Sequence, residues 1–178
     1  VENGLVDQPA GMRNLSLLLV MSLGLGLGAQ VPPAPSETHD FDFWLGEWEV
    51  TQSNGKVAGH SVIESILDGR AIKESYQTPG HYRGHSFNIY NAPAKRWEQY
   101  WVDNTGLALH LTGGLNAAGE MVLQGDRLDA EGKMVTDRIT WRNNGDGTVQ
   151  QRWESSEDGG ATWSLAFDGR YRPKPKAE

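Results

Sequence analysis

Apolar and polar residues alternate with a period of two along most of this chain, beginning in the aromatic stretch 41–51. Trp48 and Val50 fall on one side of an extended segment, and Glu47 and Glu49 fall on the other. A short run rich in Phe and Trp, at 41–44, comes directly before this segment. The pattern therefore predicts a first strand preceded by a short apolar turn.

Turn signals recur about every ten residues after Trp48, beginning with Asn54-Gly55, a dipeptide that suits a two-residue hairpin turn. The segments between them predict strands at 47–53, 56–67, 70–78, 81–90, 96–103, 107–115, 120–129, 133–142, 148–155 and 162–172. Such short links pair consecutive strands antiparallel, and closing the sheet on itself removes its open edges. We therefore predict an all-β fold, an up-and-down barrel of about ten antiparallel strands with no long helix in this region. A two-sheet sandwich is the rival architecture.

The predicted inner faces combine aromatic with polar residues. One face of the strand predicted at 96–103 carries Trp97, Gln99, Trp101 and Asp103. One face of the strand at 133–142 carries Val135, Asp137, Ile139 and Trp141, and one face of the strand at 148–155 carries Val149, Gln151 and Trp153. An unpaired buried polar group costs about 1–3 kcal/mol, so a dry core would rarely accept this mixture. A cavity with polar anchors would accept it. Alternatively, these polar groups bond to one another or to ordered water in a filled barrel.

The cavity interpretation predicts a protein that binds a small, largely apolar molecule. Its candidate ligand-binding residues are Trp97, Gln99, Trp101, Asp103, Trp141, Gln151, Trp153, Glu74 and Tyr90. Two alternatives stay open. One is an enzyme, a hydrolase or isomerase, in which an inward carboxylate such as Glu74 or Asp103 acts as base. The other is a structural or partner-binding protein with a filled barrel. Strand parity does not separate the Trp residues that line a pocket from those that fill the barrel floor.

The first forty residues have the pattern of a processed leader. Met12 and Arg13 precede an apolar run at 15–27 that ends in small residues up to Ala29. This predicts an upstream extension at 1–11 and a secretory signal peptide at 12–29 that is cleaved near Ala29, giving a secreted or periplasmic protein. The run is shorter than the roughly 20 apolar residues of a membrane span, so we expect no stable span in the mature chain. A proline-rich, extended lead at 30–39, a single barrel domain at 40–173 and a tail at 174–178 complete the predicted organisation.

Composition excludes several functions. The 178 residues carry a formal net charge of -7 and no basic run, which disfavours sequence-independent binding of nucleic acid. Because the sequence contains no Cys, disulfides, thiol catalysis and cysteine-ligated metals are excluded. His81 and His85 would lie about 13 Å apart along one strand, too far to chelate one ion. We predict no catalytic motif, metal site or cofactor, and the oligomeric state stays open.

The segment 156–163 fits the Asp-box pattern S-x-D-x-G-x-T-W that is known from sialidase propellers. A propeller needs repeated blades, and this motif occurs once. We therefore predict a structural hairpin turn, in which Ser156 and Asp158 bond to the backbone, Gly160 takes a left-handed conformation and Trp163 packs beneath.

Gly46-Glu47-Trp48, at the start of the first strand, is similar to the G-x-W signature of the calycin superfamily of lipocalin and fatty-acid-binding-protein barrels. The resemblance implies that Trp48 closes one end of the barrel and that Arg170 or Arg172, in the last strand, lies across its ring.

The segments 43–48, 84–90, 97–103 and 153–163 resemble, more closely, a family of secreted bacterial calycin-like barrels of uncharacterised function. The nitrobindins, haem barrels of the same superfamily, hold haem through a His on a late strand. The last four predicted strands of this chain contain no His, so no haem is expected.

Overall fold

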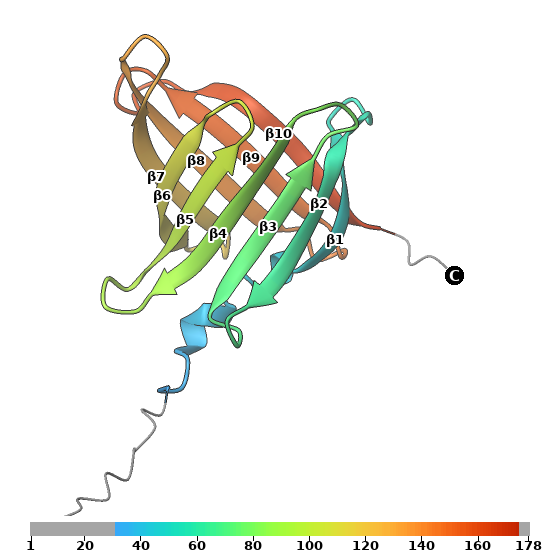
Figure 1. The fold of residues 1–178 in the computed structure, drawn as a ribbon, viewed down its shortest axis with the longest axis vertical. Helices are drawn as coiled ribbons and strands as arrows, with labels where there is room; N and C mark the ends of the chain where they lie inside the picture. The colour runs from blue at the N-terminus through green and yellow to red at the C-terminus, as the bar shows by residue number, and fades with distance from the viewer. Residues whose placement is uncertain (1–30, 175–178) are drawn as a thin grey trace, which may run out of the picture. The chain divides into compact units, whose positions relative to one another are not determined.

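The computed structural model describes residues 31–174, which contain ten antiparallel strands closed into a barrel (Figure 1). The strands are β1 (Gly46–Gln52), β2 (Val57–Ile66), β3 (Ala71–Gln77), β4 (Arg83–Asn91), β5 (Arg96–Asp103), β6 (Ala108–Leu115), β7 (Met121–Leu128), β8 (Met134–Asn143), β9 (Val149–Ser156) and β10 (Ser164–Pro173). Each strand pairs with the next along the chain, and β10 pairs with β1. The all-β, up-and-down prediction is confirmed, with boundaries within two residues of those observed, and the sandwich alternative is wrong.

The hairpin turns depend on Asn and Asp side chains that bond to the backbone. In the first turn the Asn54 side-chain oxygen accepts a hydrogen bond from the Lys56 amide at 2.9 Å, and Gly55 has φ +78°. In a later turn Asp129 accepts from the amides of Glu131 and Lys133 at 2.8 and 2.9 Å. These local bonds fix where each strand ends and therefore the register of the barrel.

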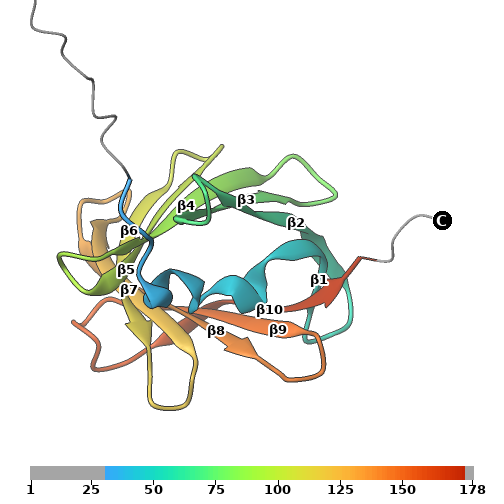
Figure 2. The ribbon, with the colours of Figure 1, turned by 90° about the horizontal axis from the view of Figure 1, so that it is seen from below.

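Two short 3-10 helices, η1 (Ser36–His39) and η2 (Asp42–Trp44), lie across one end of the barrel (Figure 2). Phe41 and Trp44 are fully buried there, with ring centroids 4.9 Å apart. The Phe41 ring also lies 5.2 Å from the ring of Trp141, and the Trp48 indole N–H donates to the Trp44 carbonyl at 2.9 Å. We call this filled end the floor and define it by Phe41, Trp44, Trp48, Trp97 and Trp141. The apolar turn predicted from the sequence is thus the closure of the barrel.

The lead predicted at 30–39 is not extended throughout, because it contains the 3-10 helix η1. Thr38 is buried and donates its hydroxyl hydrogen to the Pro35 carbonyl at 2.6 Å, so η1 packs as part of the folded unit. Of the described residues, 33–174 belong to one compact unit. The extension predicted at 1–11, the signal peptide at 12–29 and nearly all of the tail lie outside the described residues. Within 31–174, no helix has the length and apolar character needed to cross a membrane.

The expected contact of Arg170 or Arg172 with Trp48 is wrong. Both arginines lie on the outer face, where Arg170 bonds to Asp146 at 2.6 Å and Arg172 bonds to the Thr51 hydroxyl at 3.0 Å. Tyr171, between them in sequence, faces inward and meets Trp48 edge to face, with ring centroids 6.3 Å apart. The physical reason is strand alternation, which gives the inner face to Tyr171 and the outer face to both of its neighbours.

The hairpin predicted at 156–163 has the expected hydrogen bonds. The Ser156 hydroxyl donates to Asp158 at 2.7 Å and accepts from the Gly160 amide at 2.8 Å. Gly160 has φ +92°, and the Trp163 indole N–H donates to the Gly160 carbonyl at 3.0 Å. These bonds all lie within one turn and stabilise the hairpin locally.

Candidate functional site

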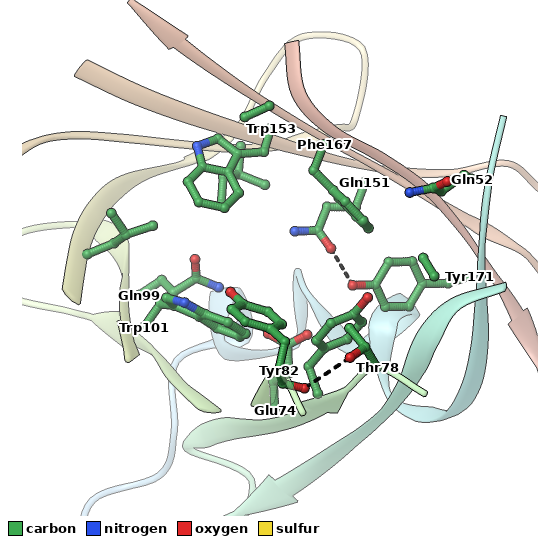
Figure 3. A pocket seen from close by; sticks show the side chains of 15 residues that line it. Gln52, Glu74, Thr78, Tyr82, Gln99, Trp101, Gln151, Trp153, Phe167 and Tyr171 are labelled. Carbon is green, nitrogen blue, oxygen red and sulfur yellow. Dashed lines mark hydrogen bonds between the residues drawn. The ribbon is translucent and has the colours of Figure 1, made fainter. Parts of the chain in front are cut away.

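A cavity of about 290 Å3 occupies the barrel between the floor and the end that carries the β1–β2 and β3–β4 hairpins (Figure 3). The aromatic residues of its wall are Tyr76, Tyr82, Trp101, Trp153, Phe167 and Tyr171. Polar groups reach it from Gln52, Glu74, Thr78, Gln99 and Gln151. This volume is close to the lower end of the range for small-molecule sites, roughly 300–1,000 Å3.

Glycines on the strands make room for the aromatic wall. A β-carbon on Gly84 would lie 2.1 Å from the Trp101 ring, and one on Gly59 would lie 2.7 Å from the Tyr76 ring. A β-carbon on Gly169 would lie 2.5 Å from the Phe167 ring. Each ring therefore lies against a bare stretch of backbone. Space is left in the centre of the barrel because these rings are held against its wall.

A chain of buried hydrogen bonds runs from β5 through β4 to β3 and ends at Glu74. The Gln99 amide nitrogen donates to Asn88 at 2.8 Å, and the Asn88 amide nitrogen donates to the Ser86 hydroxyl at 3.0 Å. Ser86 donates to one carboxylate oxygen of Glu74 at 3.0 Å, and Ser61 donates to the other at 3.1 Å. The inner faces of four adjacent strands thus converge on one carboxylate.

Burial raises the pKa of Glu74 to about 7, although the hydrogen bonds from Ser86 and Ser61 act in the opposite direction. Among residues 31–174, no Lys, Arg or His forms an ion pair with it. Burial also raises the pKa of Tyr76 to about 12 and that of Tyr171 well above its ordinary value, and the charge of Glu74 adds to both shifts. Glu74 is therefore the titratable group of the cavity that changes charge near neutral pH.

Asp103 lies at the rim and holds cavity side chains in place. It accepts hydrogen bonds from the Tyr82 hydroxyl at 2.8 Å and the Trp101 indole N–H at 3.3 Å. The Thr105 amide and hydroxyl donate to its other oxygen at 2.8 and 2.6 Å. Although burial acts to raise it, the pKa of Asp103 is lowered by the bonds from Thr105 and Tyr82. Asp103 therefore fits a positioning role better than that of a base.

Asp137 is fully buried and has a similar structural role. It accepts from the Trp153 indole N–H at 2.7 Å and from the Ser155 hydroxyl at 2.6 Å. Arg127 forms an ion pair with its second oxygen at 2.6 Å. The charge of Asp137 is thus compensated, and the bond to Trp153 orients a ring of the cavity wall.

The structure divides the candidate ligand-binding residues between three places. Those that line the cavity are Glu74, Gln99, Trp101, Gln151 and Trp153. Trp97 and Trp141 belong to the floor, where the Trp97 ring lies 5.6 Å from Phe41, and Tyr90 packs on Trp97 at 6.2 Å. These three side chains do not line the cavity because the turn at 41–44 fills the space beside them. Asp103 lies at the rim, where it bonds to Tyr82 and Trp101.

Sequence reasoning missed part of the site. The residues it missed include Gln52, Ser61, Tyr76, Thr78, Tyr82, Ser86, Asn88, Phe167 and Tyr171. Strand alternation could have identified Tyr76, because it lies two residues after Glu74 on the same face of β3. Phe167 follows a bulge between Leu165 and Phe167, where simple alternation fails.

The part of the chain at 31–174 contains no cluster of three or more side chains suited to hold a metal ion. A scan of the sequence against models of protein families finds no match, and a search of curated proteins finds no similar sequence. The fold itself, a closed ten-stranded antiparallel barrel, fits a calycin-like architecture.

Proposed function

We propose that this protein is a calycin-like, lipocalin-type barrel that binds a small, largely apolar molecule in the cavity above the floor. The observation that supports this most directly is the cavity itself, which has an aromatic wall around a buried polar network. Small-molecule sites commonly combine a mainly apolar wall with a few placed polar groups. A barrel filled along its whole length would offer no such space.

The polar groups of the cavity have spare hydrogen-bonding capacity toward a ligand. The Tyr171 hydroxyl donates to the side-chain oxygen of Gln151, which leaves the Gln151 amide nitrogen directed toward the cavity (Figure 3). Glu74 accepts two hydrogen bonds, whereas a carboxylate has room for about four. Such groups orient a ligand whose main contacts are with the aromatic wall.

Titration with a neutral apolar fluorophore, N-phenyl-1-naphthylamine, tests this function. We expect saturable quenching of Trp emission, and Trp101→Ala should weaken binding about tenfold because it removes one ring of the wall. Val102→Ala is the matched control, since this neighbouring side chain lies on the outer face and is 55% exposed. Absence of saturable binding, or equal binding by Trp101→Ala, would contradict the proposal.

One observation favours a second candidate, a hydrolase or isomerase that uses Glu74 as base. A carboxylate that lines a cavity and has a pKa of about 7 is suited to general acid and base chemistry near neutral pH. Turnover of p-nitrophenyl esters should then follow the ionisation of a group with an apparent pKa near 7, and Glu74→Gln should abolish it. A rate indifferent to this substitution would exclude Glu74 as the base.

We also propose that the protein is exported and that residues 12–29 are removed near Ala29. The apolar run at 15–27, followed by small residues, supports this. The intact mass of the protein recovered from a bacterial host would identify the cleavage site, and a product that keeps residues 12–29 would contradict export.

A further inference from the structure

Glu74 has fewer partners for its charge than the other carboxylates on the inner face. Asp137 has the guanidinium of Arg127 at 2.6 Å. Within 31–174, Asp103 has no cationic partner, but it lies at the rim and accepts hydrogen bonds from Tyr82, Trp101, Thr105 and Leu107. Glu74 lines the cavity, is 3% exposed and receives two hydroxyl donors. Its remaining acceptor positions, about two, are not filled by any residue in the described part of the chain.

The hydrogen-bond chain that leads to Glu74 is polarised toward the carboxylate. Asn88 donates to the Ser86 hydroxyl oxygen, so the single hydrogen of Ser86 is directed to Glu74. Gln99 donates to Asn88 in turn, which fixes the orientation of the Asn88 amide. Every donor in this chain lies on the side away from Glu74, and bonds in series strengthen one another. The bond from Ser86 therefore favours the ionised form of Glu74, in the direction opposite to the effect of burial.

The surroundings of this charge suit a cation. No Lys, Arg or His is among the described residues that line the cavity. The wall offers aromatic rings from Tyr76, Trp101 and Trp153, and a ring face attracts a cation within about 6 Å of its centroid. An anionic ligand would be repelled by Glu74. A wholly apolar ligand would leave the buried charge of Glu74 without a cation to compensate it.

Building on the proposed function, we propose that the ligand is a small organic cation, a protonated amine with an apolar body. The ammonium group forms an ion pair with Glu74, and the body packs against Trp101, Trp153 and Phe167. The titratable groups that face Glu74 are Tyr76 on β3 and Tyr171 on β10, and both stay neutral below pH 9. Ser61 on β2 and Ser86 on β4 do not titrate. Ionisation of Glu74 therefore controls the affinity for the amine.

Isothermal titration calorimetry with matched amine and alcohol pairs tests this inference. The pairs are 2-phenylethylamine with 2-phenylethanol, and hexylamine with hexanol. At pH 8 we expect the protein to bind each amine at least tenfold more tightly than its alcohol. Glu74→Gln should remove this preference. Glu64→Gln should preserve it, because Glu64 lies on the outer face of the neighbouring strand and pairs with Lys73 at 3.4 Å.

The pH dependence of the unsubstituted protein gives a test that does not depend on a variant. Both amines stay protonated between pH 5 and pH 8, whereas Glu74 has a pKa of about 7 and takes up a proton over this range. Amine affinity should therefore fall about tenfold for each pH unit below 7, roughly a hundredfold at pH 5.

The outcomes separate this inference from the proposed function. If the alcohols bind as tightly as the amines, or if amine affinity rises toward pH 5, the cation inference is overturned. If N-phenyl-1-naphthylamine binds and neither amine does, the cation inference fails and the binding function stands. If no probe binds, both fail.

Discussion

The floor and the cavity are built from the same strands and the same kinds of side chain, yet one is filled and the other is open. Trp97 and Trp101 lie four residues apart on the inner face of β5. Trp97 is 1% exposed and packs against Phe41, whereas Trp101 lines the cavity. The difference comes from residues 41–44, which enter one end of the barrel and occupy its centre. Whether an inward Trp is core or wall thus depends on what closes the barrel, not on the strand that carries it.

The floor and the cavity also differ in the hydrogen bonding of their indole N–H groups. In the described residues, the buried indole nitrogens without a partner are those of Trp44, Trp97 and Trp141, all in the floor. In the cavity, Trp101 and Trp153 each donate to a carboxylate. The floor is stabilised by close aromatic packing that outweighs unpaired donors. The cavity wall has less packing, and hydrogen bonds hold its rings in position.

The largest effect should come from truncating the floor. Trp141→Ala removes a fully buried ring and leaves a void, so we expect the free energy of unfolding to fall by about 3–5 kcal/mol. Trp101→Ala, in the partly exposed wall, should lower it by about half as much. Guanidinium unfolding followed by circular dichroism measures both. Equal losses would show that the floor and the cavity are not distinct in packing.

Next in size is the ion pair that supports the cavity wall. Arg127→Met leaves the charge of fully buried Asp137 without compensation, and we expect a loss of about 3 kcal/mol in the free energy of unfolding. Adding Asp137→Asn should recover part of this loss, because the uncompensated charge is then removed. The same unfolding experiment applies to the single and the double variant. A double variant less stable than Arg127→Met alone would contradict this account.

A smaller effect should appear as a dependence of stability on pH. The pKa of Glu74 is about 7 in the folded protein and 4.5 ordinarily, so between these pH values the folded protein keeps a proton that the unfolded chain releases. Stability contributed by this group is therefore present below pH 4.5 and is lost as pH rises through 7. From pH 5 to pH 8 the loss should be about 2 kcal/mol.

Substitution isolates this pH effect from that of other groups. Unfolding at pH 5 and pH 8 should show a smaller loss for Glu74→Gln than for the unsubstituted protein. Glu64→Gln, on the outer face, should behave like the unsubstituted protein. An unchanged pH dependence in Glu74→Gln would show that Glu74 ionises normally, and would weaken the contrast between a charged cavity and a neutral floor.

Local signals in the sequence account for how well the fold could be predicted. Strand alternation and turns such as Asn54-Gly55 act over a few residues, and the turn bonds formed here confirm them. The same alternation placed Glu74, Gln99 and Gln151 on the inner face, where they line the cavity. The contact of Arg170 or Arg172 with Trp48 was implied by the calycin resemblance and not by alternation, and it is Tyr171 that meets Trp48.

The remainder of the site depends on contacts between distant segments. The sequence does not distinguish Trp97 and Trp141, in the floor, from the residues of the cavity wall, because their burial depends on the turn at 41–44. The bulge before Phe167 breaks the period on which parity depends. The Trp101 ring on β5 packs against Gly84 on β4 through a diagonal contact between the two strands. The sequence around either residue does not indicate this contact.

Substitution of Gly84, which packs against Trp101, should have the smallest effect on stability and the most selective effect on the cavity. In Gly84→Ala the new methyl group would lie 2.1 Å from the Trp101 ring, so the ring must move toward the centre of the barrel. We expect a loss of about 1 kcal/mol in the free energy of unfolding and about tenfold weaker binding of N-phenyl-1-naphthylamine.

Gly114→Ala is the matched control, because a β-carbon there meets no atom within 4 Å. Since the floor lies at the other end of the cavity, its packing should not change, and the substitution should act on the cavity. Unchanged binding by Gly84→Ala would mean that the Trp101 ring does not limit the space available to a ligand.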